Sequence, residues 1–267
     1  MNSFSSSSAL IIGCGWTGKK LGKFLSEQGV QVTGTTRSKE NFKEIRSFNI
    51  EPLLLDVSLN PASGLSIPDA DTIFISLSPG RGDDRSDYPL VLARLASELQ
   101  NKKAQIILFS STSAYDRQKG IVTEKDAVPD AEADNVILKG EGVIKAQLKE
   151  AVILRFGGLY GPDRHPVKYL AGRKELKDGD APVNLVHSDD IIRICAEIIK
   201  QEVRAGVFNV CADLHPSRKV LYTSIARKRG LSVPEFEDGG SDEKRVSNQK
   251  IKETLGYKFL HPDPMDD

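Results

Sequence analysis

The sequence predicts an α/β fold in which a Rossmann-type, doubly wound parallel sheet precedes a smaller, mixed α/β C-terminal lobe. Three observations support this prediction. In the first half of the chain, short apolar runs alternate with amphipathic helical patterns, which is typical of a parallel sheet. Most of these runs are continuous, as expected for strands that helices cover on both faces. A glycine-rich loop, residues 13–18, lies between the first apolar run and the first helical pattern.

Each element of the predicted sheet follows from a local pattern. The first helical pattern has Leu21, Phe24 and Leu25 on one face and stops at Gly29, a residue type that often ends helices. The apolar runs predict strands at residues 9–12, 30–35, 52–57, 71–77, 105–110 and 151–156. The helical patterns predict helices at residues 19–28, 40–48, 88–101 and 138–149.

The second half of the chain is less regular. Its patterns predict helices at residues 191–201 and 217–228 and a short strand at residues 207–210. We expect a dinucleotide-binding domain at residues 8–160 and a smaller, substrate-facing lobe at residues 161–267. Within this lobe, residues 184–201 are expected to pack back on the Rossmann core. The lobe should lie over the carboxyl ends of the strands, where open α/β sheets bind ligands.

Composition excludes several classes of function. The chain has 37 basic and 37 acidic residues, so no excess of positive charge points to nucleic acid or to a membrane surface. It has three cysteines with no CxxC pair, which argues against a disulfide framework and indicates a reducing, cytoplasmic setting. No apolar run approaches the roughly 20 residues of a membrane span. We therefore expect a small-molecule substrate and no metal site, and an oligomer is possible.

The glycine loop has the G-x-G-x-x-G spacing of a dinucleotide site. Its residues are Gly13, Cys14, Gly15, Trp16, Thr17 and Gly18. Gly13 allows the tight turn, Gly15 lets the backbone approach a pyrophosphate, and Gly18 lets the helix pack close to the strand. The helix N-terminus stabilises the anion. The loop therefore predicts dinucleotide binding by all of these residues except Cys14.

The end of the second predicted strand indicates which dinucleotide the site prefers. An acidic residue there would accept a hydrogen bond from the ribose 2′-hydroxyl of NAD, but the sequence has Thr35, Thr36, Arg37 and Ser38. Arg37 can pair with the 2′-phosphate of NADP, so NADP is preferred and NAD stays possible. The alternative is a solvated arginine at a strand end.

Two further positions are candidate cofactor contacts. Asp56 follows the third strand and can accept a hydrogen bond from the adenine amino group, or it can serve the turn itself. Ser78 begins a polar, glycine-rich loop, residues 78–85, after the fourth strand. Loops at this edge of a sheet often close over a cofactor, although an ordinary exposed connection fits the pattern equally well.

Several segments, taken in order, resemble the short-chain dehydrogenase/reductase superfamily. The resemblance is to its extended branch, which contains proteins like the NAD-dependent epimerases and dehydratases that act on nucleotide sugars. It covers most of the chain, and no single segment decides it. The matching segments are the glycine loop, Asp56, residues 109–115 (FSSTSAY), 154–162 (LRFGGLYGP), 184–190 (NLVHSDD) and 251–257 (IKETLGY).

The resemblance implies hydride transfer beside a Ser or Thr, a Tyr and a Lys. In the extended branch the Ser or Thr lies four residues before a tyrosine, and counting back from Tyr115 gives Ser111. The alternative is a serine-rich strand end that satisfies its own backbone. Acidic residues follow this serine in the family's dehydratases, whereas Thr112 and Ser113 follow it here. Dehydratase chemistry is therefore not expected, and Ser113 becomes a candidate substrate contact.

The chain departs from the family at its central catalytic residue. The family Tyr and Lys form Y-x-x-x-K, and the only lysine placed to match is Lys139, which puts Asn135 at the Tyr position. An asparagine cannot supply a titrating proton. Lys139 can still bind the nicotinamide ribose, or it can be an ordinary surface lysine on a helix.

Other side chains could replace the missing acid/base. Tyr115 is the first choice, with Lys139 as the cation that lowers its pKa, although Tyr115 can instead pack the loop. The other candidates are Tyr160, His165 and His187, and His187 can also be a helix cap. A further residue, Arg164, can bind a phosphate or carboxylate of the substrate.

These observations favour an NAD(P)-dependent oxidoreductase or epimerase that acts on a nucleotide sugar or a similar polar hydroxylated substrate. Ser111, Lys139 and Tyr115 are its predicted catalytic residues. Ser113, Arg164, His165 and His187 are its predicted substrate contacts. The missing tyrosine leaves a second interpretation open, namely a catalytically degenerate NADP(H)-binding sensor or regulatory protein.

Overall fold

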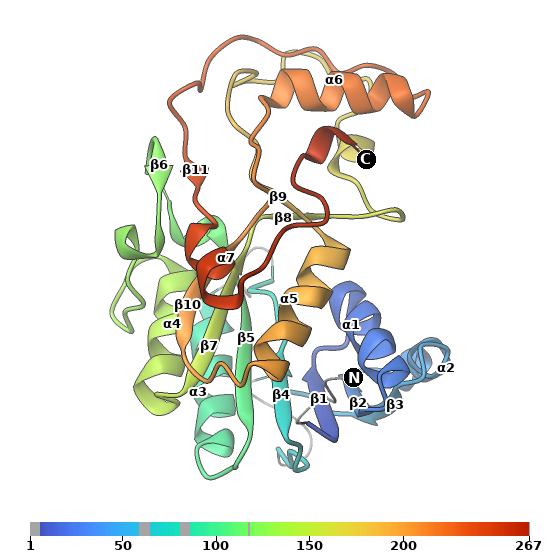
Figure 1. Cartoon of the computed structure of the whole chain (residues 1–267), viewed down its shortest axis with the longest axis vertical. Coiled ribbons are helices and arrows are strands. Elements are labelled where there is room, and N and C mark those ends of the chain that lie inside the picture. The colour runs from blue at the N-terminus through green and yellow to red at the C-terminus, as the bar shows by residue number, and fades with distance from the viewer. Residues whose placement is uncertain (1–5, 59–64, 81–85, 117, 267) are drawn as a thin grey trace. The chain divides into compact units, whose positions relative to one another are not determined.

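A seven-stranded sheet is the main element of the fold, with strand order β10-β7-β5-β4-β1-β2-β3 (Figure 1). The computed structural model describes residues 6–58, 65–80, 86–116 and 118–266. The strands of this sheet are β1 (Ser8–Ile12), β2 (Gln31–Thr36), β3 (Glu51–Leu54), β4 (Thr72–Ile75), β5 (Gln105–Ser111), β7 (Ala151–Phe156) and β10 (Gly206–Val210).

The pairing around β1 sets the position of the glycine loop. β1 pairs in parallel with β2 on one side and with β4 on the other, and β2–β3 and β4–β5 are parallel as well. In the sheet, β2 and β3 therefore lie on one side of β1, and β4 and β5 lie on the other. Open α/β sheets bind ligands at the carboxyl ends of the strands beside such a switch. The predicted α/β class with a Rossmann-type parallel sheet is confirmed.

The chain divides into two compact units, and neither is a continuous segment. The first unit contains residues 1–114, 127–155 and 192–208, and the second contains residues 115–126, 156–191 and 209–267. Residues 192–208 thus group with the glycine loop, whereas residues 184–191 belong to the second unit. The division into functional domains at residue 160 stays a prediction.

In the described part of the chain, five helices lie between successive strands of the main sheet. They are α1 (Trp16–Glu27), α2 (Phe42–Arg46), α3 (Tyr88–Leu99), α4 (Val136–Gln147) and α5 (Ser188–Lys200). α3 and α4 pack against each other. Gly140 of α4 allows this, because a Cβ at that position would lie 2.8 Å from the Tyr88 ring and 2.9 Å from Leu92.

A buried ion pair links α4 to the sheet inside the first unit. The Arg155 Nη2 atom donates to Glu141 Oε2 at 2.6 Å, and its Nε atom donates to Oε1 at 2.9 Å. Both side chains are fully buried. The carbonyl of Ala127 accepts a further bond from Arg155, and the hydroxyl of Ser110 donates to Glu141. Since every charged atom named here has a partner, the desolvation cost of burial is offset.

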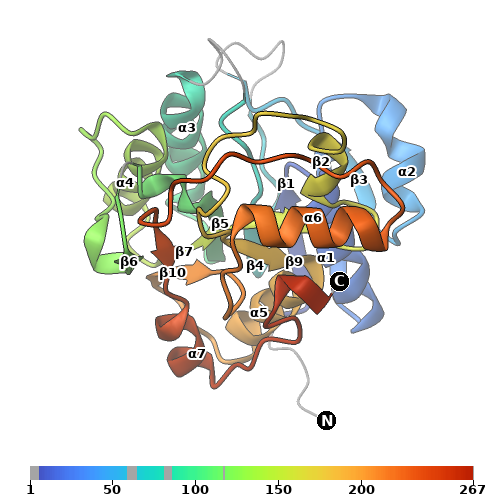
Figure 2. The ribbon, with the colours of Figure 1, turned by 90° about the horizontal axis from the view of Figure 1, so that it is seen from above.

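The described part of the second unit contains two small two-stranded sheets and the helices α6 (Arg218–Lys228) and α7 (Gln249–Leu255), which Figure 2 labels. β6 (Ile121–Val122) pairs with β11 (Arg245–Val246), and β8 (Gly158–Tyr160) pairs with β9 (Leu185–His187). α6 lies beside the short C-terminal turn η6 (Pro264–Asp266). The buried core of this unit is formed by Tyr160, Val167, Val183, Leu185, Leu221, Tyr222, Ile225 and Ala226.

The structure differs from the predicted elements mainly in long-range pairing. The strand predicted at residues 207–210 is β10, and it lies at the edge of the main sheet. The small strands β6, β8, β9 and β11 were not predicted, because each has only two or three residues and no periodic pattern. None of the helices in the described part of the chain combines the length and apolarity that a membrane span requires.

Candidate functional site

A cavity of about 730 Å³ lies at the carboxyl ends of β1 to β4, within the first unit. This volume is typical of a small-molecule or cofactor site. Its described lining comes from the glycine loop, the ends of β2, β3 and β4, and the start of α3. The lining residues are Gly13, Cys14, Gly15, Thr35, Thr36, Arg37, Ser38, Asn41, Leu55, Val57, Ser58, Ser76, Leu77, Ser78, Pro79, Gly80, Asp87, Tyr88 and Val91.

Gly13 fixes the turn out of β1. Its φ is +86°, and a Cβ there would lie 2.7 Å from the Ser76 carbonyl oxygen, so only glycine fits without strain. The N–H of Gly13 donates to Thr35 Oγ1, and the N–H of Cys14 donates to the Thr35 carbonyl oxygen, both at 2.9 Å. The end of β2 therefore holds the loop in place.

Gly15 leaves the start of α1 open to a ligand. It is the N-cap of α1, no side chain caps the helix, and the first turn has no acidic residue. A Cβ on Gly15 would meet nothing within 4 Å. The uncapped N–H groups and the helix dipole favour an anion at this point.

The rest of the glycine loop supports the fold rather than the cavity wall. Gly18 packs α1 on β1, since a Cβ there would lie 3.0 Å from Ile11. Thr17 is buried, and the Trp16 ring contacts the Lys20 ammonium, whose Nζ lies 5.2 Å from the ring centroid. None of Trp16, Thr17 and Gly18 is among the described lining residues.

Arg37 is an exposed lining residue beside a hydrogen-bonded turn. Thr36 Oγ1 accepts from Asn41 Nδ2 at 2.9 Å and from the Ser38 N–H at 3.3 Å, which fixes the backbone on both sides of Arg37. Within the described ranges, the Arg37 guanidinium makes no hydrogen bond or ion pair. Its donors are therefore available to a ligand at the cavity.

Asp56 has the turn role that was the alternative to adenine binding. Its Oδ1 accepts from the Ser58 N–H at 2.9 Å. This hydrogen bond lowers the pKa of the Asp56 carboxyl below its usual value, and the nearby charges of Arg37 and Arg94 act in the same direction. Leu55, Val57 and Ser58 line the cavity, whereas Asp56 is not among the described lining residues.

Ser78 lies at the cavity with Pro79 and Gly80, as expected for the start of the polar loop. Residues 81–85 of that loop lie outside the described residues. Cys14 also lines the cavity, but its thiol packs beneath the loop against Gly34. Burial raises the pKa of Cys14 to about 12, so the thiol is not a nucleophile at neutral pH.

Asn135 is the N-cap of α4. Its Oδ1 accepts from the N–H groups of Ile137 and Leu138, at 2.9 and 3.2 Å, and its Nδ2 donates to the Ser113 carbonyl oxygen. The residue at the family tyrosine position therefore joins the start of α4 to the loop after β5. Within the described part of the chain, the Lys139 ammonium has no hydrogen-bond or ion-pair partner.

Ser111 and Ser113 bond to each other at the end of β5. The Ser111 hydroxyl donates to Ser113 Oγ at 3.0 Å and accepts from the Ser113 N–H at 3.1 Å. This is the local bonding that was the alternative to an active-site role. Neither serine is among the described lining residues of the cavity, and neither is Lys139.

Tyr115 is completely buried within the second unit. Its hydroxyl donates to Asn209 Oδ1 at 2.7 Å, and its carbonyl oxygen accepts from the Lys244 ammonium. Asn209 is fixed in turn by its N–H, which donates to Glu124, and by its Nδ2, which donates to the Ser247 carbonyl. This environment favours the packing role of Tyr115 over the acid/base role.

The predicted substrate contacts His165 and His187 are buried, and each uses Nδ1 to accept a backbone N–H. His165 accepts from Val167 at 3.1 Å, and His187 accepts from Asp189 at 3.2 Å. Both histidines pack edge-on against the fully buried Tyr160 ring. His187 thus has the capping geometry at the start of α5 that the sequence allowed. Arg164 is exposed.

Several lining residues were missed by the sequence analysis. Asn41, Asp87, Tyr88 and Val91 come from helical segments whose ends face the carboxyl edge of the sheet. The available signal was position alone, because residues just after a strand or at the start of the next helix meet at that edge.

Comparison with known proteins decides the family. The chain is 32% identical to Protein YeeZ of Escherichia coli (strain K12) over 266 residues, which is 96% of this chain and 96% of that protein. The chain belongs to the YeeZ family. No family model matches the sequence.

Solved structures place this chain within a wider fold. The chain aligns with a functionally unknown conserved protein from Silicibacter pomeroyi DSS at 26% identity and a TM-score of 0.80, covering 97% of this chain and 96% of that chain. It also aligns with UDP-glucuronic acid 4-epimerase from Bacillus cereus, solved in complex with NAD, at 21% identity and a TM-score of 0.77, covering 97% and 93%. The fold is that of the extended short-chain dehydrogenases/reductases, and the predicted resemblance is confirmed.

Proposed function

We propose that the cavity at the glycine loop binds a nicotinamide dinucleotide, with NADP preferred over NAD. The observation that carries this proposal is the combination of an open helix N-terminus at Gly15 with an exposed Arg37 at the end of β2, which has no partner among the described residues. The first suits a pyrophosphate, and the second suits the 2′-phosphate that only NADP carries. The solved B. cereus epimerase of the same fold holds NAD.

The residues present fit such a ligand. Gly15 leaves the backbone at the start of α1 uncovered, and the cavity volume suits a cofactor of this size. Ser78 would bound the ligand at the end of β4. Asp56 is not among the described lining residues, so contact with the adenine amino group would require its second carboxylate oxygen to reach the cavity.

The reaction that this fold supports best is an oxidation–reduction or an epimerisation on a nucleotide sugar or a similar polar hydroxylated substrate. When bound, the dinucleotide would supply hydride transfer. Ser111 would hold the substrate oxygen, with Ser113 beside it, and Lys139 would bind the ribose. Arg164, an exposed residue, would suit a substrate phosphate. A cytoplasmic location is part of the same proposal.

A second function is favoured by a specific observation. Asn135 caps α4, and the Tyr115 hydroxyl is buried against Asn209, so neither residue offers a titrating proton to the Ser111 side chain. His165 and His187 use Nδ1 on backbone N–H groups. A catalytically degenerate NADP(H)-binding sensor needs no acid/base, and these contacts support it.

The decisive experiment is calorimetric titration of the full-length protein with NAD, NADH, NADP and NADPH. We expect saturable binding with one site per chain and tighter binding of the 2′-phosphorylated pair. Failure of all four to bind would remove the proposal. Tighter binding of NAD than of NADP would remove only the role of Arg37.

A second experiment separates enzyme from sensor. Purified protein with the preferred dinucleotide is offered carbonyl compounds and nucleotide sugars, with absorbance of the reduced nicotinamide and product analysis as readouts. Turnover that is lost in Ser111→Ala and Lys139→Met supports the enzyme. Tight dinucleotide binding without turnover on any substrate supports the sensor.

A further inference from the structure

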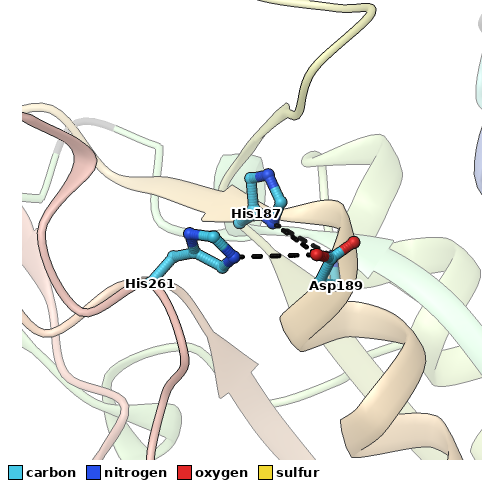
Figure 3. Close-up of side chains that lie close together, drawn as sticks. All are labelled: His187, Asp189 and His261. Carbon is cyan, nitrogen blue, oxygen red and sulfur yellow. Dashed lines mark hydrogen bonds and ion pairs between the residues drawn. The ribbon is translucent and has the colours of Figure 1, made fainter. Parts of the chain in front are cut away.

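Three side chains with metal-binding donor atoms meet at the start of α5 in the second unit (Figure 3). His187 ends β9, Asp189 lies in the first turn of α5, and His261 comes from the C-terminal segment after α7. One donor atom from each lies within 4.8 Å of the other two. None of the three lines the cavity at the glycine loop.

The spacing of the donor atoms is close to that of a coordination site. His187 Nδ1 and His261 Nε2 each lie 3.7 Å from Asp189 Oδ2. Ligands at about 2.1 Å from a tetrahedral ion lie roughly 3.4 Å apart, so each of these two donor pairs would contract by a few tenths of an ångström around an ion. The two imidazole centroids are 3.6 Å apart, and both rings turn a nitrogen toward the carboxylate (Figure 3).

The neighbouring residue, Asp190, holds this arrangement in place. Its buried carboxylate accepts from the Tyr257 hydroxyl at 2.8 Å, from the Leu260 N–H at 2.7 Å and from the His261 N–H at 3.1 Å. His261 is therefore fixed against the start of α5, although it lies far away in the sequence. Ligands that are already positioned lose little conformational entropy when they bind an ion.

The state of the donors also suits an ion. His187 Nδ1 accepts the Asp189 N–H at 3.2 Å, so it carries no proton, and an ion that takes up its single lone pair would replace this hydrogen bond. The side chains of Asp189 and His261 are 54% and 34% exposed. An ion can therefore enter from solvent, and water can complete its coordination.

We propose that His187, Asp189 and His261 form a binding site for a divalent transition-metal ion such as Zn²⁺, with at least one coordination position open to water. Two imidazoles and one carboxylate suit Zn²⁺, Co²⁺ and Ni²⁺, whereas Mg²⁺ and Ca²⁺ require mostly oxygen ligands. The ion would join the β9–α5 junction to the C-terminal segment. The site does not depend on the proposed dinucleotide.

The test uses chelator-treated, full-length protein titrated with Zn²⁺ alone by calorimetry and with Co²⁺ alone by visible absorption. One ion per chain, the absorption bands of four- or five-coordinate Co²⁺ and a raised melting temperature are expected. His261→Ala and Asp189→Asn should each weaken Zn²⁺ binding on the order of 100-fold or more. Mg²⁺ should not compete.

Matched controls come from the same unit. His215→Gln removes a histidine outside the cluster, and Asp266→Asn removes an exposed aspartate, so both should keep the wild-type affinity. Because His261 and Asp189 are partly exposed, their variants leave the apolar core intact. Absence of saturable Zn²⁺ and Co²⁺ binding at millimolar ion overturns the proposal, and so does unchanged affinity in both His261→Ala and Asp189→Asn.

Discussion

The Nδ2 atom of Asn135 donates to the carbonyl oxygen of Ser113 at 2.9 Å, while its Oδ1 atom caps α4. One side chain thus serves the helix and the loop that follows β5. In a protein with the fold of the extended short-chain dehydrogenases/reductases, this is the position at which the sequence comparison expects a catalytic tyrosine. At this position the chain has an asparagine that connects α4 to the loop after β5.

Removing this link should cost stability. Asn135→Ala should lower the free energy of unfolding by about 1 kcal/mol, because two N–H groups at the start of α4 lose their acceptor. Asn135→Asp keeps the capping oxygen and should lose less. Urea denaturation followed by circular dichroism measures both, and equal stability of wild type and Asn135→Ala would contradict the capping role. Asn135→Tyr should lose the same cap.

Substitution of two glycines of the loop by alanine should have different effects, one on stability and the other on ligand binding. Gly13→Ala should destabilise the fold by about 2 kcal/mol or more, since its φ is +86° and its Cβ would collide with the Ser76 carbonyl. Gly15→Ala has room for its Cβ and should fold normally, but the methyl group should obstruct an anion at α1. Thermal melting and NADP titration separate the two effects. A large loss of stability in Gly15→Ala would contradict the open space at the start of α1.

Arg37 should distinguish the two dinucleotides. Arg37→Ala should weaken NADP and NADPH binding by roughly 10- to 100-fold, which corresponds to a charge-assisted hydrogen bond or two, and leave NAD binding nearly unchanged. Lys39→Ala removes an exposed charge from the same turn and is the matched control. Equal loss of NAD and NADP binding would mean that Arg37 does not read the 2′-phosphate.

The buried ion pair should be costly to break. Glu141→Gln should lower the free energy of unfolding by about 3–5 kcal/mol, because it leaves the Arg155 guanidinium charged and buried without its counter-ion. Glu150→Gln, an exposed change just after α4, is the control. Chemical denaturation gives both values, and a loss below about 1 kcal/mol would indicate that water reaches Arg155.

The three thiols should be inert in the native protein. Burial raises the pKa of Cys14 to about 12 and raises those of Cys195 and Cys211 further, so almost no thiolate exists at neutral or mildly alkaline pH. Iodoacetamide should label none of them in native buffer and all three in urea. Mass spectrometry reads the labels. Rapid native labelling of Cys14 would show that the loop opens.

Local patterns in the sequence were sufficient for the sheet and the glycine loop. β1, the loop and α1 are contiguous, and their order alone predicts an anion site at the carboxyl end of the sheet. The position of Arg37 at the cavity could also be predicted, because Arg37 directly follows a predicted strand. These predictions rest on neighbours in the chain, for which periodicity and spacing carry information.

Contacts between residues that are far apart in the chain could not be predicted from the sequence. Nothing near Tyr115 in the sequence indicates that Asn209 accepts its hydroxyl, and nothing near Asp189 indicates that His261 lies beside it. The capping role of Asn135 was not predicted, and the sequence analysis noted only that a tyrosine is missing there. A cap can be assigned only where the first residue of the helix is known, and α4 begins two residues earlier than predicted. The proposed acid/base role of Tyr115 could not be judged from the sequence, because it depends on the distant partner Asn209.

The edge position of β10 limits how this protein can be rearranged by recombination. A segment cut after residue 160 would keep the glycine loop but lose β10, and the exposed backbone of β7 would then be free to pair with other chains. A chain shortened at this point would therefore tend to aggregate. Variation in such a chain is more easily accommodated in the loops at the carboxyl edge of the sheet, one substitution or insertion at a time, than by swapping halves.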